Sequence, residues 1–125
     1  MAHYAELNEE NVVVNVFVGR DEDEVVDGIT DWEEYYGNVL NATVKRTSYN
    51  TWGNVHYSQE VDENGERIPS EDQSKAFRAN YAGKDYSYLP DEDVFLAPEP
   101  NHHLTLGTWE LNTTNWIWEF TPDEA

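Results

Sequence analysis

The sequence predicts a mainly β protein, a small antiparallel, hairpin-rich sheet domain with one short helix at about residues 31–36. Three observations predict this class. Short runs of alternating apolar and polar residues are separated by turn residues. Only one segment has apolar residues at helical spacing. Aromatic side chains make up 14% of the 125 residues, enough large groups for one core. A single domain, 1–125, is expected.

The N-terminal segment predicts a β-hairpin. His3–Leu7 alternates weakly, Asn8–Asn11 is a four-residue turn, and Val12–Val18 is rich in β-branched residues. The second of these strands is apolar on most of both faces. We therefore expect it to be central in its sheet or covered on both sides.

The predicted helix begins with a capping box. Thr30 fits the N-cap position, Glu33 its reciprocal partner, and Gly37 the C′ position. We expect its apolar stripe to pack into the core; the stripe comprises Ile29, Trp32, Tyr35 and Tyr36.

The middle of the chain predicts a strand at Val39–Tyr49, followed by a hairpin or arm at 50–74. The Asn64-Gly65 step fits a type I′ turn. This segment is either a contact specific to this protein or a surface loop without a partner.

The chain is organised around the stretch Phe77–Pro100. Gly83 is expected to adopt a positive φ in a tight bend. Tyr86–Tyr88 alternates as a strand, Pro90–Asp93 has turn chemistry, and Val94–Leu96 returns. This predicts a further hairpin that carries several aromatic side chains.

The C-terminal segment predicts a fourth hairpin. Leu104–Leu111 is a strand with a possible bulge at Gly107, and Asn112–Asn115 is a turn. The last strand, Trp116–Phe120, places three aromatics on one face. That face is either core or an exposed docking surface, and core is the favoured interpretation.

The net charge of −19 comes from 26 acidic and 7 basic residues. Such a chain is repelled by nucleic acid and by anionic membranes, so neither is an expected partner. The acid excess serves either solubility or docking onto a basic patch of another protein.

No metal, cofactor or catalytic site is expected. The acidic run Asp21–Glu24 lacks the spacing of a Ca²⁺ loop, and His102–His103 lacks converging ligands. The sequence contains no cysteine, no Gly-rich phosphate loop and no Gly-x-Ser-x-Gly motif. A non-enzymatic protein is therefore predicted.

The start of the chain, Met1–Glu6, has no basic or apolar signal-peptide region, and no apolar run is long enough to span a membrane. We expect a protein synthesised in a cytoplasm.

Several of these residues together resemble a family of small phage virion proteins common in marine phages and cyanophages. The resemblance rests on the string Phe77–Gly83, on Tyr86-x-Tyr88, on the acidic turn and Phe95, on Pro98-x-Pro100 and on the Trp-rich end. It covers 1–18 loosely and 48–50 and 77–120 more closely, which implies that the hairpin or arm at 50–74 is an insertion.

The resemblance implies a structural protein of the virion. The expected role is a decoration or knob on the outer capsid surface, and the alternative is a tail-fibre or tail-associated protein. The implied partner is the major capsid protein or another virion protein, with possible self-association. The residues expected to contact a partner are Tyr81, Tyr86, Tyr88, Phe95 and Trp118.

A further alternative is an acidic DNA mimic that inhibits a DNA-binding enzyme. A mimic would array its acids at regular spacing along helices or one sheet face. Here the acids lie mainly in predicted turns and loops, which favours the structural role.

Overall fold

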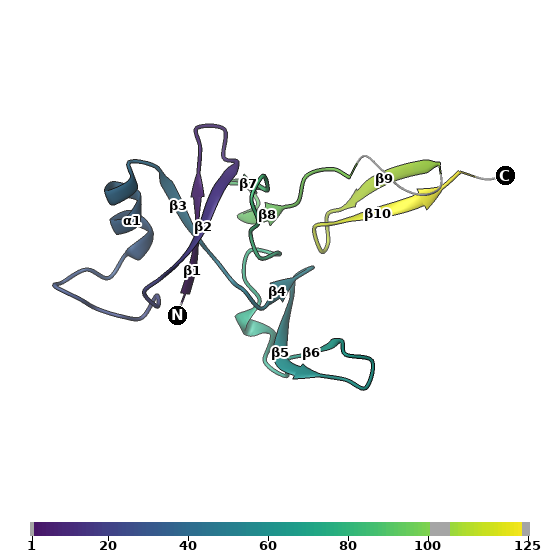
Figure 1. The fold of residues 1–125 in the computed structure, drawn as a ribbon, viewed down its shortest axis with the longest axis horizontal. Coiled ribbons are helices and arrows are strands. Elements are labelled where there is room, and N and C mark those ends of the chain that lie inside the picture. Colours follow the sequence, from purple (N-terminus) through teal and green to yellow (C-terminus); the bar gives the residue numbers. More distant parts are fainter. Residues whose placement is uncertain (1, 101–105, 124–125) are drawn as a thin grey trace.

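The computed structural model describes residues 2–100 and 106–123. The predicted fold class is confirmed, with 44% strand and 10% helix. The strands form four small antiparallel sheets, ordered β2-β1-β3, β4-β5-β6, β7-β8 and β9-β10 (Figure 1). The elements in order are β1 (Ala2–Leu7), β2 (Val13–Gly19), α1 (Trp32–Leu40), β3 (Thr43–Thr47), β4 (Thr51–Trp52), β5 (Val55–Val61), β6 (Arg67–Pro69), a 3₁₀ turn η1 (Gln73–Lys75), β7 (Ser87–Leu89), β8 (Val94–Leu96), β9 (Gly107–Asn112) and β10 (Ile117–Pro122).

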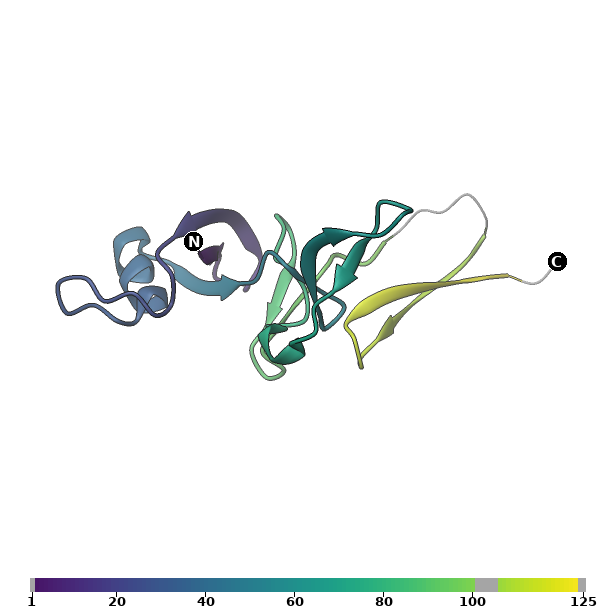
Figure 2. The ribbon, with the colours of Figure 1, turned by 90° about the horizontal axis from the view of Figure 1, so that it is seen from below.

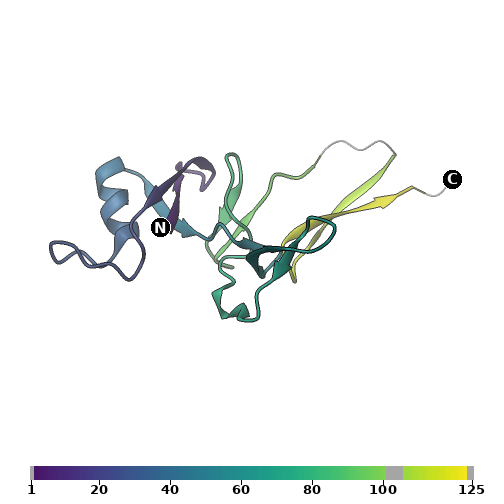
Figure 3. The same cartoon turned by 60° about the horizontal axis from the view of Figure 1, so that its bottom comes forward.

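The molecule is elongated. Figures 1 and 3 show α1 and the sheet β2-β1-β3 at one end and the hairpin β9-β10 at the other, with the remaining strands between them. No helix among the described residues is long and apolar enough to cross a membrane.

The core forms on both faces of β1, the central strand. One buried cluster lies toward α1 and contains Ala2, Tyr4, Trp32 and Val44. The other lies toward β7 and β8 and contains Ala5, Leu7, Val13, Ala82, Tyr88 and Phe95. The alternation of side chains along β1 therefore fills two layers of core at once.

The prediction that the second strand is central, or covered on both sides, is wrong. β2 is an edge strand, because β1 pairs with β2 on one side and with β3 on the other. Val14 and Val18 are 43% and 52% exposed. The many apolar residues of β2 therefore do not mean that both faces of this strand are buried.

The helix begins one residue later than predicted. Asp31, not Thr30, is the N-cap, and its carboxylate accepts a hydrogen bond from the Glu34 N–H at 3.1 Å. Glu33 does not close a capping box, since its carboxylate instead accepts from the Arg46 N–H at 2.6 Å.

The helix also ends later than predicted. Gly37 lies inside it, and the left-handed residue at the C-cap is Asn41, with φ 53°. A Cβ at Gly37 would lie 2.9 Å from the Ala42 carbonyl oxygen, so glycine permits this close return of the chain. The predicted strand at 39–49 is correspondingly shorter. In the predicted stripe, Trp32 is buried, while Tyr35 is 38% exposed.

The arm at 50–74 contains the predicted hairpin, β5-β6. Only Gly65 of the Asn64-Gly65 step has a positive φ, so the turn is not type I′. The Asp62 carboxylate instead accepts hydrogen bonds from the N–H groups of Asn64 and Glu66. Whether the arm is an insertion stays a prediction.

In the bend before β7, the residues with positive φ are not the one that was predicted. Arg78 and Ala79 adopt positive φ values of 51° and 64°, and Gly83 does not. A Cβ at Gly83 would lie 3.0 Å from a Tyr86 ring carbon, so this glycine permits close packing of that ring. The hairpin β7-β8 forms as predicted, with Tyr88 opposite Phe95.

The C-terminal hairpin pairs β9 with β10 in a continuous register, without a bulge at Gly107. The Phe120 ring packs there instead, 2.5 Å from the position of a Cβ on Gly107. Trp116 lies in the turn with φ 60°, so the predicted row of aromatics in the last strand is reduced to Trp118 and Phe120. Leu104 and Thr105, predicted to start the first strand, lie outside the described residues.

Candidate interaction surfaces

Two of the five predicted contact residues are core residues. The side chain of Phe95 is fully buried, and Tyr88 is 6% exposed. The Tyr88 hydroxyl donates a short hydrogen bond to the Asp93 carboxylate, and the Tyr88 ring packs on Phe95 with centroids 5.4 Å apart. In this conformation neither side chain offers area to a partner.

The other three predicted residues do not form one surface with them. Tyr81 is half-buried and packs edge-on against Tyr49, with centroids 5.3 Å apart. Tyr86 packs against the Phe95 side of the core. Trp118 lies on the separate β9-β10 hairpin, where its indole N–H donates to the Ala97 carbonyl at 2.9 Å.

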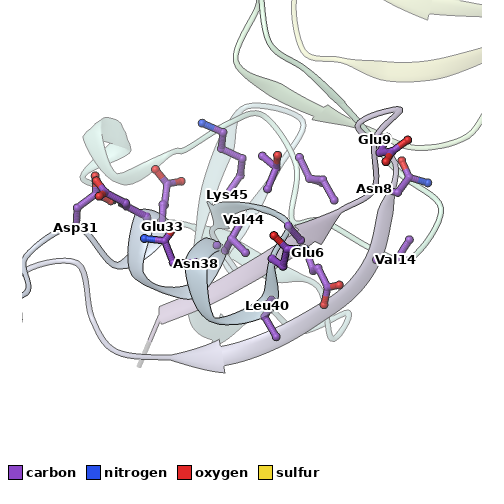
Figure 4. A pocket seen from close by; sticks show the side chains of 16 residues that line it. Glu6, Asn8, Glu9, Val14, Asp31, Glu33, Asn38, Leu40, Val44 and Lys45 are labelled. Carbon is purple, nitrogen blue, oxygen red and sulfur yellow. Dashed lines mark hydrogen bonds between the residues drawn. The ribbon is translucent and has the colours of Figure 1, made fainter.

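A groove of about 850 Å³ lies between α1 and the β1–β2 turn. Figure 4 shows Glu33, Asn38 and Leu40 of the helix on one side and Glu9 and Val14 on the other. Apolar side chains of Val14, Leu40 and Val44 contribute to its lining. Five carboxylates line it, and Lys45 is its one basic residue; the carboxylates belong to Glu6, Glu9, Asp31, Glu33 and Glu34.

Most of this negative charge is not balanced locally. Glu33 is paired with Arg78 at 2.7 Å. Within residues 2–100 and 106–123, no ion pair joins Glu6, Glu9 or Glu34 to a basic side chain. The groove is therefore suited to a positively charged partner rather than an anionic one. No sequence motif predicts the groove, because the residues that line it come from separate elements of the chain.

The described part of the chain contains no group of three or more histidine and acidic side chains placed to hold a metal ion. Two of the acids in the run Asp21–Glu24 pair with arginines, Glu24 with Arg20 at 3.1 Å and Glu22 with Arg46 at 3.7 Å. His102 and His103 lie outside the described residues.

A polar network around Arg78 holds the groove's wall in place. The Arg78 guanidinium bonds to Glu33 of α1, to Asp93 at 2.8 Å and to the Arg46 carbonyl of β3 at 2.9 Å. It also lies 4.6 Å from the Phe77 ring centroid. Because the network joins residues up to 45 positions apart, no local pattern in the sequence predicts it.

The network shifts the pKa values of two side chains, Tyr88 and Asp93. Burial and the hydrogen bond to Asp93 raise the pKa of Tyr88 to about 12. Burial raises the pKa of Asp93, but hydrogen bonds from Tyr88 and Arg78 outweigh it and hold that pKa below its ordinary value.

We expect the Tyr88 shift to appear as a loss of stability at high pH. A raised pKa means that the folded state favours the protonated phenol, so this contribution is complete below pH 10 and is lost as the pH rises toward about 12. Urea unfolding between pH 8 and 12 measures it. Tyr88→Phe should flatten the alkaline decline. Parallel curves for the wild type and Tyr88→Phe would contradict this prediction.

None of the protein-family models, curated proteins or solved structures compared with this chain matches it. The resemblance to phage virion proteins therefore stays a prediction. The function proposed for the chain depends on its own residues and their geometry.

Proposed function

We propose that this chain is a non-enzymatic structural protein of a phage particle, placed on the outer capsid surface as a decoration or knob. The observation that carries the proposal is the negative groove beside α1, on a protein whose net charge is −19. Its partner is a basic surface of the major capsid protein or of another virion protein.

The sign of the charge supports the outer location. Nucleic acid repels a strongly acidic protein, so the packaged genome excludes it from the interior surface of a shell. Carboxylates around a partly apolar groove complement lysine and arginine side chains, whose alkyl stems pack on apolar surface while their charged ends reach the acids.

The groove lining also supports a binding role. It combines carboxylates, asparagines and apolar side chains with a single lysine, and it contains no histidine, serine or cysteine. The groove is a rigid feature, because the Arg78 network ties α1 to β3 and to the β8 hairpin. A rigid, charged concave surface is suited to docking with a fixed orientation.

A side-chain-resolution cryo-EM map of the intact particle tests the location. Density for this chain on the icosahedral shell is the expected result. Density confined to the tail would replace the decoration role with the tail-associated alternative. Absence from the particle would overturn both structural roles and favour the DNA-mimic alternative.

Rebinding to particles that lack the protein tests the groove. We expect the double variant Glu6→Gln/Glu34→Gln to bind at least about tenfold more weakly, since two groove charges are lost. The matched control is Glu60→Gln/Glu63→Gln, which removes the same charge from the exposed end of the β5-β6 arm. Equal loss in both variants would show that binding does not depend on the groove in particular.

A further inference from the structure

We propose that the unpaired edge of β2, residues 14–19, is a docking site for an extended segment of a partner protein. The segment adds to the sheet as a further strand and carries basic residues at both of its ends. This inference does not rest on the proposed location in a phage particle, because it concerns the backbone edge of β2, which shares only Val14 with the groove lining.

The two edges of the sheet β2-β1-β3 differ. The β3 edge is closed at Arg46 by two side chains: Glu33 accepts from the Arg46 N–H at 2.6 Å, and Arg78 donates to the Arg46 carbonyl at 2.9 Å. A strand from another protein cannot pair there without displacing this ion pair. Folded proteins commonly block sheet edges by such devices.

The β2 edge is covered only at its beginning. Val13 bonds to the chain before β7, with its N–H donating to the Tyr86 carbonyl and its carbonyl accepting from the Asp85 N–H, both at 2.8 Å. Beyond that point, and among the described residues, no backbone hydrogen bond outside the β1–β2 ladder involves residues 14–19. Figure 2 shows β2 along the upper margin of the molecule.

The side chains of β2 leave this edge unprotected. Residues 13–19 contain no charged residue and no proline, the groups that normally discourage added strands. Val14 and Val18 are 43% and 52% exposed, although the protein is otherwise strongly charged. A short, β-branched, uncharged edge is the surface to which extended peptides add.

The charges next to β2 determine which segment fits. The acidic run Asp21–Glu24 begins two residues after the strand, and Arg20 and Arg46 pair with two of its four carboxylates. At the other end Glu9 and Glu10 precede the strand, and among the described residues no ion pair joins either of them to a basic side chain. Acidic residues therefore lie at both ends of the edge, so the partner segment carries basic residues at both of its ends. A second copy of the chain would bring its own acidic run to the edge and is disfavoured.

A labelled-protein NMR titration with short synthetic peptides tests the proposal. The probe alternates threonine and valine and carries two lysines at each end. The matched control has the same length and carries glutamates in place of the lysines. We expect the probe to bind at least about tenfold more tightly, with amide shifts and slowed hydrogen exchange concentrated at residues 14–19.

Two further comparisons separate strand addition from charge attraction. A probe with alternate backbone nitrogens methylated keeps its charge but loses donors, and it should not bind. In the protein, Val18→Lys should weaken binding of the probe about tenfold, whereas Val18→Thr should not. The control Val39→Lys adds the same charge at a helical position that is 64% exposed, and this variant should bind the probe normally.

Three results would overturn the proposal. Equal affinity for the lysine and glutamate peptides would contradict the predicted basic partner. Binding of the methylated probe, or shifts centred on the groove residues, would show that charge alone attracts the peptide. A concentration-dependent dimer that Val18→Lys abolishes would assign the edge to a second copy of this chain.

Discussion

Replacing Arg78 by alanine is expected to lower the free energy of unfolding by about 3 kcal/mol, at the lower end of the range for breaking a buried ion pair. The guanidinium is 11% exposed and bonds to Glu33, Asp93 and the Arg46 carbonyl. Its removal leaves Glu33, itself 31% exposed, without its partner. The expected loss of stability is at the lower end of the range because the Asp93 side chain is 55% exposed and is rehydrated when Arg78 is removed. Urea denaturation of each variant measures the loss.

Two controls separate the network from general effects of losing an arginine. Arg20→Ala removes an arginine that is 50% exposed and pairs with Glu24, so it should cost less than about 1 kcal/mol. Because Arg78 has a φ of 51°, Arg78→Gly should be about 1 kcal/mol more stable than Arg78→Ala. A loss at Arg78→Ala no larger than at Arg20→Ala would contradict the structural role of the network.

Local patterns in the sequence predicted the hairpins and the single helix correctly. Strand alternation and turn residues act between neighbours, so β1-β2, β5-β6, β7-β8 and β9-β10 could be located. The sequence could not show which strand is central. β2 is the more apolar of the first two strands, yet β1 is covered on both faces, because strand order depends on where β3 returns.

The errors at turns have a common physical cause. Positive φ was assigned to Gly83, where glycine is the favoured residue, but contacts made elsewhere hold Arg78 and Ala79 in that conformation. At the helix, Asp31 rather than Thr30 is the N-cap, and the Glu33 side chain accepts from the Arg46 N–H of β3 instead of closing a capping box. In both places a distant contact overrides the local preference.

The predicted contact residues illustrate the same limit. Alternation identified Tyr88 and Phe95 as members of one aromatic hairpin, and they do pair across it. Alternation cannot say whether an aromatic face is covered by other elements, and here the β1 sheet covers it. The groove and the β2 edge depend on distant parts of the chain and left no recognisable motif.

The largest expected effect on the C-terminal hairpin comes from Asn80. Its side chain is buried; it accepts a hydrogen bond from the Gly53 N–H at 2.8 Å and donates to the carbonyls of Phe95 and Trp116 at 3.0 and 2.9 Å. Asn80→Ala leaves these groups unsatisfied, at about 1–3 kcal/mol each when they stay buried, so we expect a loss of at least about 3 kcal/mol. Denaturant unfolding measures that loss.

The same change should release β9-β10 before the rest of the protein unfolds. A two-stranded hairpin is marginally stable in water, and this one pairs with no other strand among the described residues. Hydrogen exchange should therefore accelerate at residues 107–122 more than in β1. Asn38→Ala, at an exposed helical position, is the control and should leave both regions unchanged.

Asn80→Asp distinguishes hydrogen bonding from the loss of side-chain volume. The aspartate has nearly the same shape and accepts from Gly53, but as a carboxylate it donates to neither carbonyl and is buried as a charge. It should destabilise more than Asn80→Ala near neutral pH. Because burial raises the pKa of such a carboxyl group, part of the stability should return as the pH falls and the group gains a donor. If Asn80→Asp proves as stable as the wild type at neutral pH, the two donated hydrogen bonds do not hold the C-terminal hairpin to the body of the protein.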